Sequence, residues 1–190
     1  MTPSGPTEPV PSAGDVVAHF QRSLGAGAPT PSGEVLGLLM ALHRNNLDQW
    51  QREDLTRAAD ADDAAVAAAK RDIDALNATR HGLVEAIDAA LAAALEQERW
   101  ATPATESPAM VFDRLSVLVI RISSTEDAAS SQRDDRDFYA ARLPVLRRQL
   151  ALLQEALEAF FDDLRTGRKR FVPYQSLKLY GPRAAGIRRD

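Results

Sequence analysis

Apolar side chains recur at alternating steps of three and four residues between positions 143 and 164. They are Leu143, Leu146, Leu150, Leu153, Leu157, Phe160 and Leu164. Because an α-helix has about 3.6 residues per turn, this spacing places them on one face of a single helix, as the core of a helical bundle requires. No part of the sequence shows the alternation of apolar and polar residues that is typical of a β-strand. The chain is therefore predicted to be all-α.

Breaks rich in proline, glycine and polar residues divide the 190 residues into helical segments. We expect a short helix over 15–24 and main helices over 32–59, 63–98, 110–122 and 136–166. Residues 123–135 fit either a loop or the start of the last helix. The prediction is a bundle of about four main helices with a short N-terminal helix and an extended basic C-terminal tail.

The segment ends and the domain limits follow from the same breaks. Ser32 and Ser107 are expected as N-caps and Gly167 as the C′ residue of the last helix. Pro144 indicates a kink in that helix or a late start. The predicted organisation is a disordered segment over 1–12, a helical bundle over 13–167 and a basic tail over 168–190.

Composition excludes several classes of chemistry and of partner. Without cysteine, the chain has no disulfide, thiolate zinc site, iron–sulfur cluster or cysteine nucleophile. Its formal net charge of -4 argues against a general attraction to nucleic acid or anionic lipid. No window approaches the roughly 20 apolar residues of a membrane span, and the first residues do not resemble a secretory signal. We expect a cytoplasmic protein whose tail aromatics dock on the bundle rather than bind RNA, with no nucleic-acid and no membrane partner.

Polar side chains interrupt the apolar faces of three predicted helices. On the helix over 32–59 the seam begins with Leu36 and Leu39 and continues with His43, Asn46, Trp50, Glu53 and Arg57, with Asp54 beside it. The helix over 63–98 carries Arg80 on its seam, Asn77 on one flank, and Asp74, His81 and Asp88 on the next row. The helix over 110–122 is apolar except for Asp113, Arg114, Ser116 and Arg121.

These interruptions predict one shared polar cluster. Buried charges cost several kcal/mol each unless they are paired and hydrogen-bonded. The helix over 110–122 is short and apolar, so we expect it to be central and its charges to be buried. The expected arrangement has Arg80, Arg114 and Arg121 facing Glu53, Asp54, Asp74 and Asp113. We predict that this cluster forms a polar pocket between the second, third and fourth helices, because bundle cores are where helical proteins build ligand sites.

Four motifs carry a family resemblance. They are His43-x-x-Asn46-x-x-x-Trp50-x-x-Glu53-Asp54-x-x-Arg57; Lys70-x-x-Ile73-Asp74-x-x-Asn77-x-x-Arg80 with Ile87-Asp88; Ser107-Pro108-x-x-x-x-Asp113-Arg114-Leu115-Ser116; and Arg170-Phe171-Val172-Pro173-Tyr174 with Leu177-Lys178-Leu179-Tyr180. In this order they resemble a bacterial family catalogued as domain of unknown function 4254, over residues 35–181. The resemblance implies an all-helical protein and supplies no reaction, cofactor or catalytic residue.

The leading functional hypothesis is binding, or binding and transformation, of a small anionic metabolite. Arg80, Arg114 and Arg121 would neutralise its charge, because a guanidinium binds phosphate or carboxylate through two hydrogen bonds. His43 is the candidate acid or base, held by Glu53 or Asp54. The remaining expected ligand contacts are Asn46 and Asn77 as orienting groups, Trp50 as a stacking surface, and Asp113 within the cluster.

Two other functions stay open. One is a non-enzymatic assembly or adaptor protein, as a homodimer or with a protein partner, in which a closed polar network only specifies helix packing. The other is a magnesium-dependent nucleotide or sugar-phosphate hydrolase, with Glu53 and Asp54 facing Asp74 or Asp88. The chain lacks both the Glu-x-x-His motif of di-iron bundles and a pair of Glu-x-x-Glu motifs. We therefore predict no metal site and no cofactor.

Overall fold

The computed structural model describes residues 10–25, 32–57, 62–132 and 134–177. They form the helices α1 (Ala13–Ser23), α2 (Glu34–Thr56), α3 (Asp63–Ala94), α4 (Pro108–Ser130), α5 (Arg136–Ala140) and α6 (Leu143–Arg165), and the short strands β1 (Thr102–Pro103) and β2 (Lys169–Arg170). None of the helices in these ranges combines the length and the apolar character of a membrane span. The all-α prediction is confirmed.

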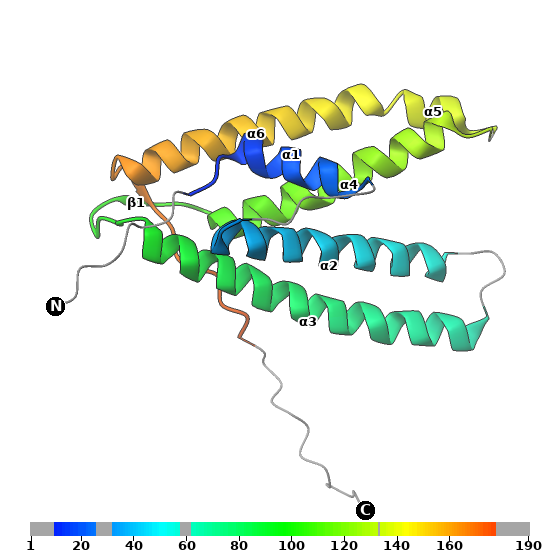
Figure 1. The fold of residues 1–190 in the computed structure, drawn as a ribbon, viewed down its shortest axis with the longest axis horizontal. Helices are drawn as coiled ribbons and strands as arrows, with labels where there is room; N and C mark the ends of the chain where they lie inside the picture. Colours follow the sequence, from blue (N-terminus) through cyan, green and yellow to red (C-terminus); the bar gives the residue numbers. More distant parts are fainter. Residues whose placement is uncertain (1–9, 26–31, 58–61, 133, 178–190) are drawn as a thin grey trace, which may run out of the picture.

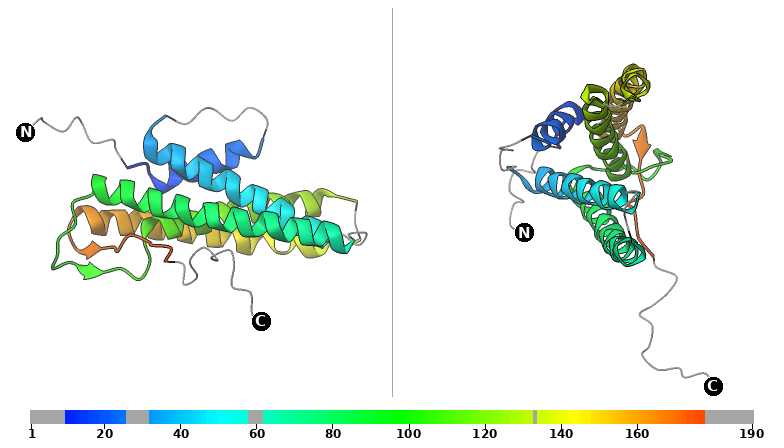
Figure 2. Two further views of the ribbon diagram at one scale, coloured as in Figure 1. Left: turned by 90° about the horizontal axis from the view of Figure 1, so that it is seen from below. Right: turned by 90° about the vertical axis from the view of Figure 1, so that its right-hand side faces the viewer.

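Two antiparallel helix pairs form the body of the molecule (Figure 1). α2 lies along α3, and α4 lies along α6, with α5 at the turn between α4 and α6. Viewed end-on, the two pairs diverge, and α1 lies on one side of the junction between them (Figure 2). α1 contacts α2, α4 and α6 and so closes that side of the core.

The core lies where the two pairs and α1 meet. Its largest fully buried side chains are Phe20, Phe112, Phe161, Leu39, Leu42, Ile87, Leu91, Leu115, Ile120, Leu157, Leu164 and His43. The predicted apolar seam of the last helix is confirmed, since its members are buried or pack against this core. No residue of α2 beyond Asn46 is buried. The seam of α2 therefore turns polar because the helix leaves the core at that point.

Two helix starts differ from the prediction. Ser32 does not cap α2, because Gly33 is the N-cap at a φ of 102° and makes no side-chain hydrogen bond. Glycine adopts such a conformation without a steric penalty. The last helix starts late: α6 begins after a short break that follows α5, and Pro144 lies in its first turn, where a missing N–H leaves no bond unmade.

Other helix ends agree with the sequence or extend the prediction. Ser107 caps α4 by accepting a hydrogen bond from the Met110 N–H, and Gly167 has the positive φ of 66° expected after a helix end. The ambiguous residues 123–130 continue α4. The predicted end of α2 at Ala59, the N-terminal residues 1–9 and the tail beyond Leu177 lie outside the described residues.

The described part of the tail docks on the bundle. β2 pairs with β1 in parallel, and Phe171 is buried behind it. The chain then follows α3: the Phe171 N–H donates to Gln97 Oε1 at 2.6 Å, and the Tyr174 N–H donates to Asp88 Oδ2 at 2.9 Å. The Ser176 N–H donates to Glu85. The backbone N–H groups of this extended segment are thus bonded by side-chain oxygens of α3 and of the residues that follow it, not by a neighbouring strand.

Asp88 is the central anchor of this docking. Its side chain is fully buried, and its second oxygen accepts a hydrogen bond of 3.0 Å from the Ala109 N–H in the first turn of α4. Burial raises the pKa of Asp88 above its ordinary value, although hydrogen bonds from Ser107, Tyr174 and Ala109 act in the opposite direction. One carboxylate therefore joins α3, α4 and the tail.

We expect Asp88→Asn to release the tail, because an amide has one acceptor oxygen for two N–H donors. A buried donor without an acceptor costs about 1–3 kcal/mol. Amide hydrogen exchange over residues 171–177 is expected to accelerate by at least about 10-fold, as measured by mass spectrometry. Asp127→Asn, on an exposed part of α4, is the matched control and leaves this exchange unchanged. Unaltered exchange in Asp88→Asn would contradict the anchoring role.

Candidate functional site

A hydrogen-bonded polar chain crosses the interface between α2 and α4. Asn46 donates through Nδ2 to Asp113 Oδ1 at 2.8 Å and to Ser116 Oγ at 3.1 Å. Asp113 and Ser116 are three residues apart and therefore lie on the same face of α4. All three side chains are buried. The interface between α2 and α4 thus contains a buried, hydrogen-bonded polar contact.

Arg80 extends this chain to α3. Its Nε lies 2.9 Å from each carboxylate oxygen of Asp113, and its Nη2 also pairs with Oδ2. The hydrogen bond that Arg80 donates to Asp113 is the main reason that the pKa of Arg80 is raised above its ordinary value. The Arg80 side chain is 31% exposed and that of Asp113 is 9% exposed. The pair therefore lies at the edge of the sealed region, with the cation on the outer side.

His43 is the last member of this hydrogen-bonded polar chain on the side of the protein core. It is 1% exposed, its Nδ1 lies 2.8 Å from Ser116 Oγ, and its ring stacks on Phe20 with centroids 4.4 Å apart. Its Nε2 makes no hydrogen bond within the described part of the chain. Burial lowers the pKa of His43 to about 4, outweighing the Phe20 carbonyl, which favours the protonated ring. The imidazole is consequently neutral at pH 7.

The other predicted acids lie away from this chain. Glu53 and Asp54 both pair with Arg57 on their own helix, at 3.3 and 3.6 Å, and Asp74 pairs with Lys70 at 2.7 Å. The expectation that Glu53 or Asp54 holds His43 is therefore wrong. Its physical cause is that these acids lie on parts of α2 and α3 that reach solvent, where a cation one helical turn away is the nearest partner.

Trp50 and Asn77 complete the predicted set on α2 and α3. Both are half-buried, and the Asn77 side chain makes no hydrogen bond within the described ranges. Neither residue lines the groove formed by Arg80 and α4. Their expected contacts with a ligand stay predictions.

Arg114 and Arg121 point outward, contrary to the expectation that charges on this apolar helix are buried. Arg114 Nη1 pairs with Glu106 Oε2 at 2.8 Å, and its side chain is 56% exposed. Arg121 is exposed, and its guanidinium has no hydrogen-bond or ion-pair partner within the described residues. The physical reason is that the diverging helix pairs leave one face of α4 open to solvent.

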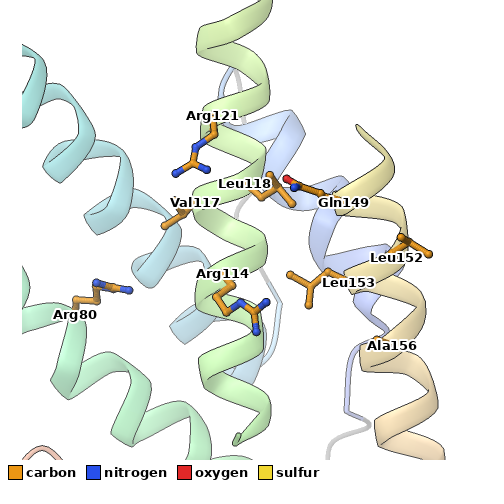
Figure 3. A pocket seen from close by; sticks show the side chains of 9 residues that line it. All are labelled: Arg80, Arg114, Val117, Leu118, Arg121, Gln149, Leu152, Leu153 and Ala156. Atoms are coloured by element: carbon orange, nitrogen blue, oxygen red, sulfur yellow. The ribbon is translucent and has the colours of Figure 1, made fainter. Parts of the chain in front are cut away.

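An open groove of about 630 Å³ lies along this face of α4. It is lined by Arg80, Arg114, Val117, Leu118, Arg121, Gln149, Leu152, Leu153 and Ala156. Figure 3 shows α4 between Arg80 on one side and the α6 residues on the other, with the Arg80 guanidinium directed towards α4 and that of Arg114 towards α6. The three predicted arginines therefore share one groove. It lies between α3, α4 and α6, not between the second, third and fourth helices.

The part of the chain that the structure describes contains no evident set of metal ligands. No group of three or more His, Asp or Glu side chains is placed to hold an ion there. Asp88, which the hydrolase alternative offered beside Asp74 as the partner of Glu53 and Asp54, is hydrogen-bonded to α4 and to the tail. A magnesium site built from the predicted carboxylates therefore has no support from their positions.

Three residues of this region were not predicted as site residues. Ser116 stood out as a small polar residue on an apolar helix, three positions after Asp113, and that spacing was the available signal. Glu106 lies in the loop before α4 and pairs with Arg114, and Gln149 lies on α6, where its side chain lines the groove. For these two, no pattern in the sequence indicates a contact with the arginines, because both are brought there by tertiary packing.

Comparison with known proteins supplies a family. No curated protein and no solved structure matches the chain significantly. The model of one family, described as "Protein of unknown function (DUF4254)", matches residues 37–172. That range contains the whole polar chain and every residue lining the groove. The protein therefore belongs to the DUF4254 family, as its four motifs indicated.

Proposed function

We propose that this protein binds a small anionic ligand in the groove between α3, α4 and α6. The observation that carries the proposal is that Arg80, Arg114 and Arg121 all line one open groove. Guanidinium groups suit phosphate and carboxylate because they donate two parallel hydrogen bonds. A cavity volume of about 630 Å³ lies within the range of small-molecule sites.

The three arginines have different roles in this proposal. Asp113 neutralises Arg80, so the positive charge left for a ligand comes from Arg114 and Arg121. These two are seven residues apart, about 10 Å along the helix, and both side chains are long enough to approach one anion between them. The ion pair of Arg114 with Glu106 is exposed and therefore weak. An anionic ligand competes with Glu106 for this guanidinium.

The sealed polar chain serves as the support of the groove. Ser116, Asn46 and Asp113 hold Arg80 in place and fix α2, α3 and α4 relative to one another. Among the residues that line the groove, the charged side chains are all arginines. No acid or base of this lining is suited to proton transfer at neutral pH, so we propose binding and assign no reaction.

Arg121→Gln is expected to weaken binding of inorganic pyrophosphate by about 10-fold, because a hydrogen bond between charged groups contributes about 1.5–3 kcal/mol. Glu106→Gln is expected to strengthen binding several-fold by freeing Arg114. Isothermal titration calorimetry at low ionic strength measures both changes. Arg44→Gln is the matched control, since Arg44 is exposed on α2 and does not line the groove.

The outcomes separate the proposal from its main alternative. Loss of affinity in Arg121→Gln with no loss in Arg44→Gln supports the groove as the site. Equal weakening in both variants indicates attraction to surface charge in general and contradicts the proposal. If the wild-type protein binds neither pyrophosphate nor a hexose phosphate, an assembly role with a purely structural polar chain becomes the better account.

A further inference from the structure

The geometry points to an amphipathic ligand: an anion held by the arginines and joined to an apolar chain that lies between α4 and α6. This inference rests on the proposed function and names the ligand class for the same site. It comes from a second hollow beside the groove, on the side away from Arg121.

The second hollow has a volume of about 330 Å³. It is lined by Pro103, Ala104, Thr105, Glu106, Val111, Arg114, Leu153, Ala156, Leu157, Phe160 and Lys169. Arg114, Leu153 and Ala156 line both hollows, so the two adjoin. The strand β1 and the loop that follows it form one wall of the second hollow.

The two adjoining hollows follow one another along the interface of the antiparallel helices α4 and α6. Along α4, Arg121, Leu118, Arg114 and Val111 follow one another at steps of three and four residues. Along α6, the same direction runs from Gln149 through Leu153 and Ala156 to Phe160. Apolar surface predominates in both hollows, but the end near Arg121 carries a guanidinium that has no partner among the described residues, whereas the charged groups at the Phe160 end are paired.

The charged groups at the Phe160 end are paired, although the Asp163 carboxylate serves two cations, Lys169 and Arg168. Lys169 Nζ pairs with Asp163 at 3.0 Å, and Glu106 pairs with Arg114 at the junction of the two hollows. Half-buried Phe160 supplies apolar surface between these ion pairs, whereas Val111 and Leu157 line the hollow from the buried core. A hydrocarbon chain gains affinity by covering such surface, while a second anionic group would have to compete with Asp163 for Lys169.

An exposed apolar side chain in the first hollow also favours a ligand that has an apolar part. Leu152 lines the first hollow and is 54% exposed, beside Leu153 and Ala156. An anion alone would gain nothing from this apolar surface next to the arginines. An anion that carries an alkyl chain contacts both the arginines and the apolar surface. Its alkyl chain would extend from the arginines across Leu153 and Ala156 into the second hollow.

The test compares three probes by calorimetry, all kept at monomeric concentrations: inorganic phosphate, octyl phosphate and octyl glucoside. Octyl phosphate is expected to bind about 100-fold more tightly than phosphate, because several methylene groups leave water. Octyl glucoside, which has the chain without the anion, is expected to bind far more weakly than octyl phosphate.

Ala156→Phe fills the groove where the two hollows meet. It is expected to remove most of the advantage of octyl phosphate, measured as the ratio of the octyl phosphate affinity to the phosphate affinity of the same variant, because Ala156 also lines the anion groove. Ala159→Phe is the matched control, since Ala159 is exposed on the next turn of α6 and lines neither hollow. Both alanines are exposed, so both variants are expected to fold as the wild type does.

Each outcome decides the inference. Equal affinity for phosphate and octyl phosphate overturns the apolar chain and leaves the anion site intact. Equal affinity for octyl phosphate and octyl glucoside overturns both, because the arginines then contribute nothing. Binding of octyl phosphate that begins only when it forms micelles, or that Ala159→Phe lowers as much as Ala156→Phe does, also overturns the inference.

Discussion

Arg80→Ala is expected to lower the free energy of unfolding by about 3 kcal/mol, because it leaves the buried Asp113 carboxylate without its cation. Asn46 alone then remains to stabilise the negative charge. Urea unfolding followed by circular dichroism measures the change. Arg52→Ala is the matched control, because Arg52 pairs with Asp72 at the surface of the same hairpin and such pairs contribute about 0–1 kcal/mol.

The double variant Arg80→Met/Asp113→Leu distinguishes a buried-charge penalty from lost packing. Replacing both members of a buried ion pair by apolar residues of similar volume is often neutral or stabilising. We expect the double variant to recover most of the stability that Arg80→Ala loses. A loss below about 1 kcal/mol in Arg80→Ala, or a double variant less stable than the single one, would show that Asp113 is solvated in solution.

Acidification from pH 6.5 to pH 4 is expected to remove about 3 kcal/mol of stability through His43 alone. In the unfolded chain His43 binds a proton near its ordinary pKa of 6.5, whereas in the folded protein its pKa is about 4. Between these values the unfolded state binds more protons, so stability falls as the pH falls. Above pH 6.5 the contribution is fully present and constant.

The measurement is the free energy of unfolding against pH for the wild type and for His43→Gln. Carboxylates titrate in both proteins, including Asp88, whose raised pKa acts in the opposite direction, so the difference between the curves isolates His43. His19→Gln is the matched control, because it replaces a histidine at the surface of α1 and leaves the buried ring of His43 in place. Parallel curves for the wild type and His43→Gln would refute the buried neutral histidine.

The pH prediction also constrains the role of His43. A neutral imidazole sealed between Phe20 and Ser116 does not contact the groove. Its assignment as an acid or base stays a prediction that our proposed function does not use. What the structure assigns to His43 is a place in the support of Arg80, through Ser116 and Asn46.

Much of the polar chain was accessible from spacing alone. His43, Asn46, Arg80 and Asp113 each occupy a position where a bundle helix normally carries an apolar residue, and the structure brings these four into one network. Burial makes unpaired polar groups costly, so polar residues at core positions of packed helices are expected to meet. This argument needs only the helical period.

The same argument failed for neighbouring residues. Asp113 and Arg114 are adjacent in the chain, yet one is buried against Arg80 and the other is exposed beside Glu106. Successive residues differ by about 100° around a helix axis, and the width of the covered face decides which of them reaches solvent. That width depends on how far the two helix pairs diverge, which the sequence of one helix does not report.

Helical periodicity and the residues at helix ends were thus sufficient for the all-α class, the core seam of α6, and the caps at Ser107 and Gly167. The open face of α4, the docking of the tail on Asp88 and the meeting of three arginines in one groove were decided by the tertiary structure. The reason is physical: a local pattern reports where a side chain lies around its own helix, whereas burial, ion pairing and access to solvent depend on which other helix faces it and at what angle.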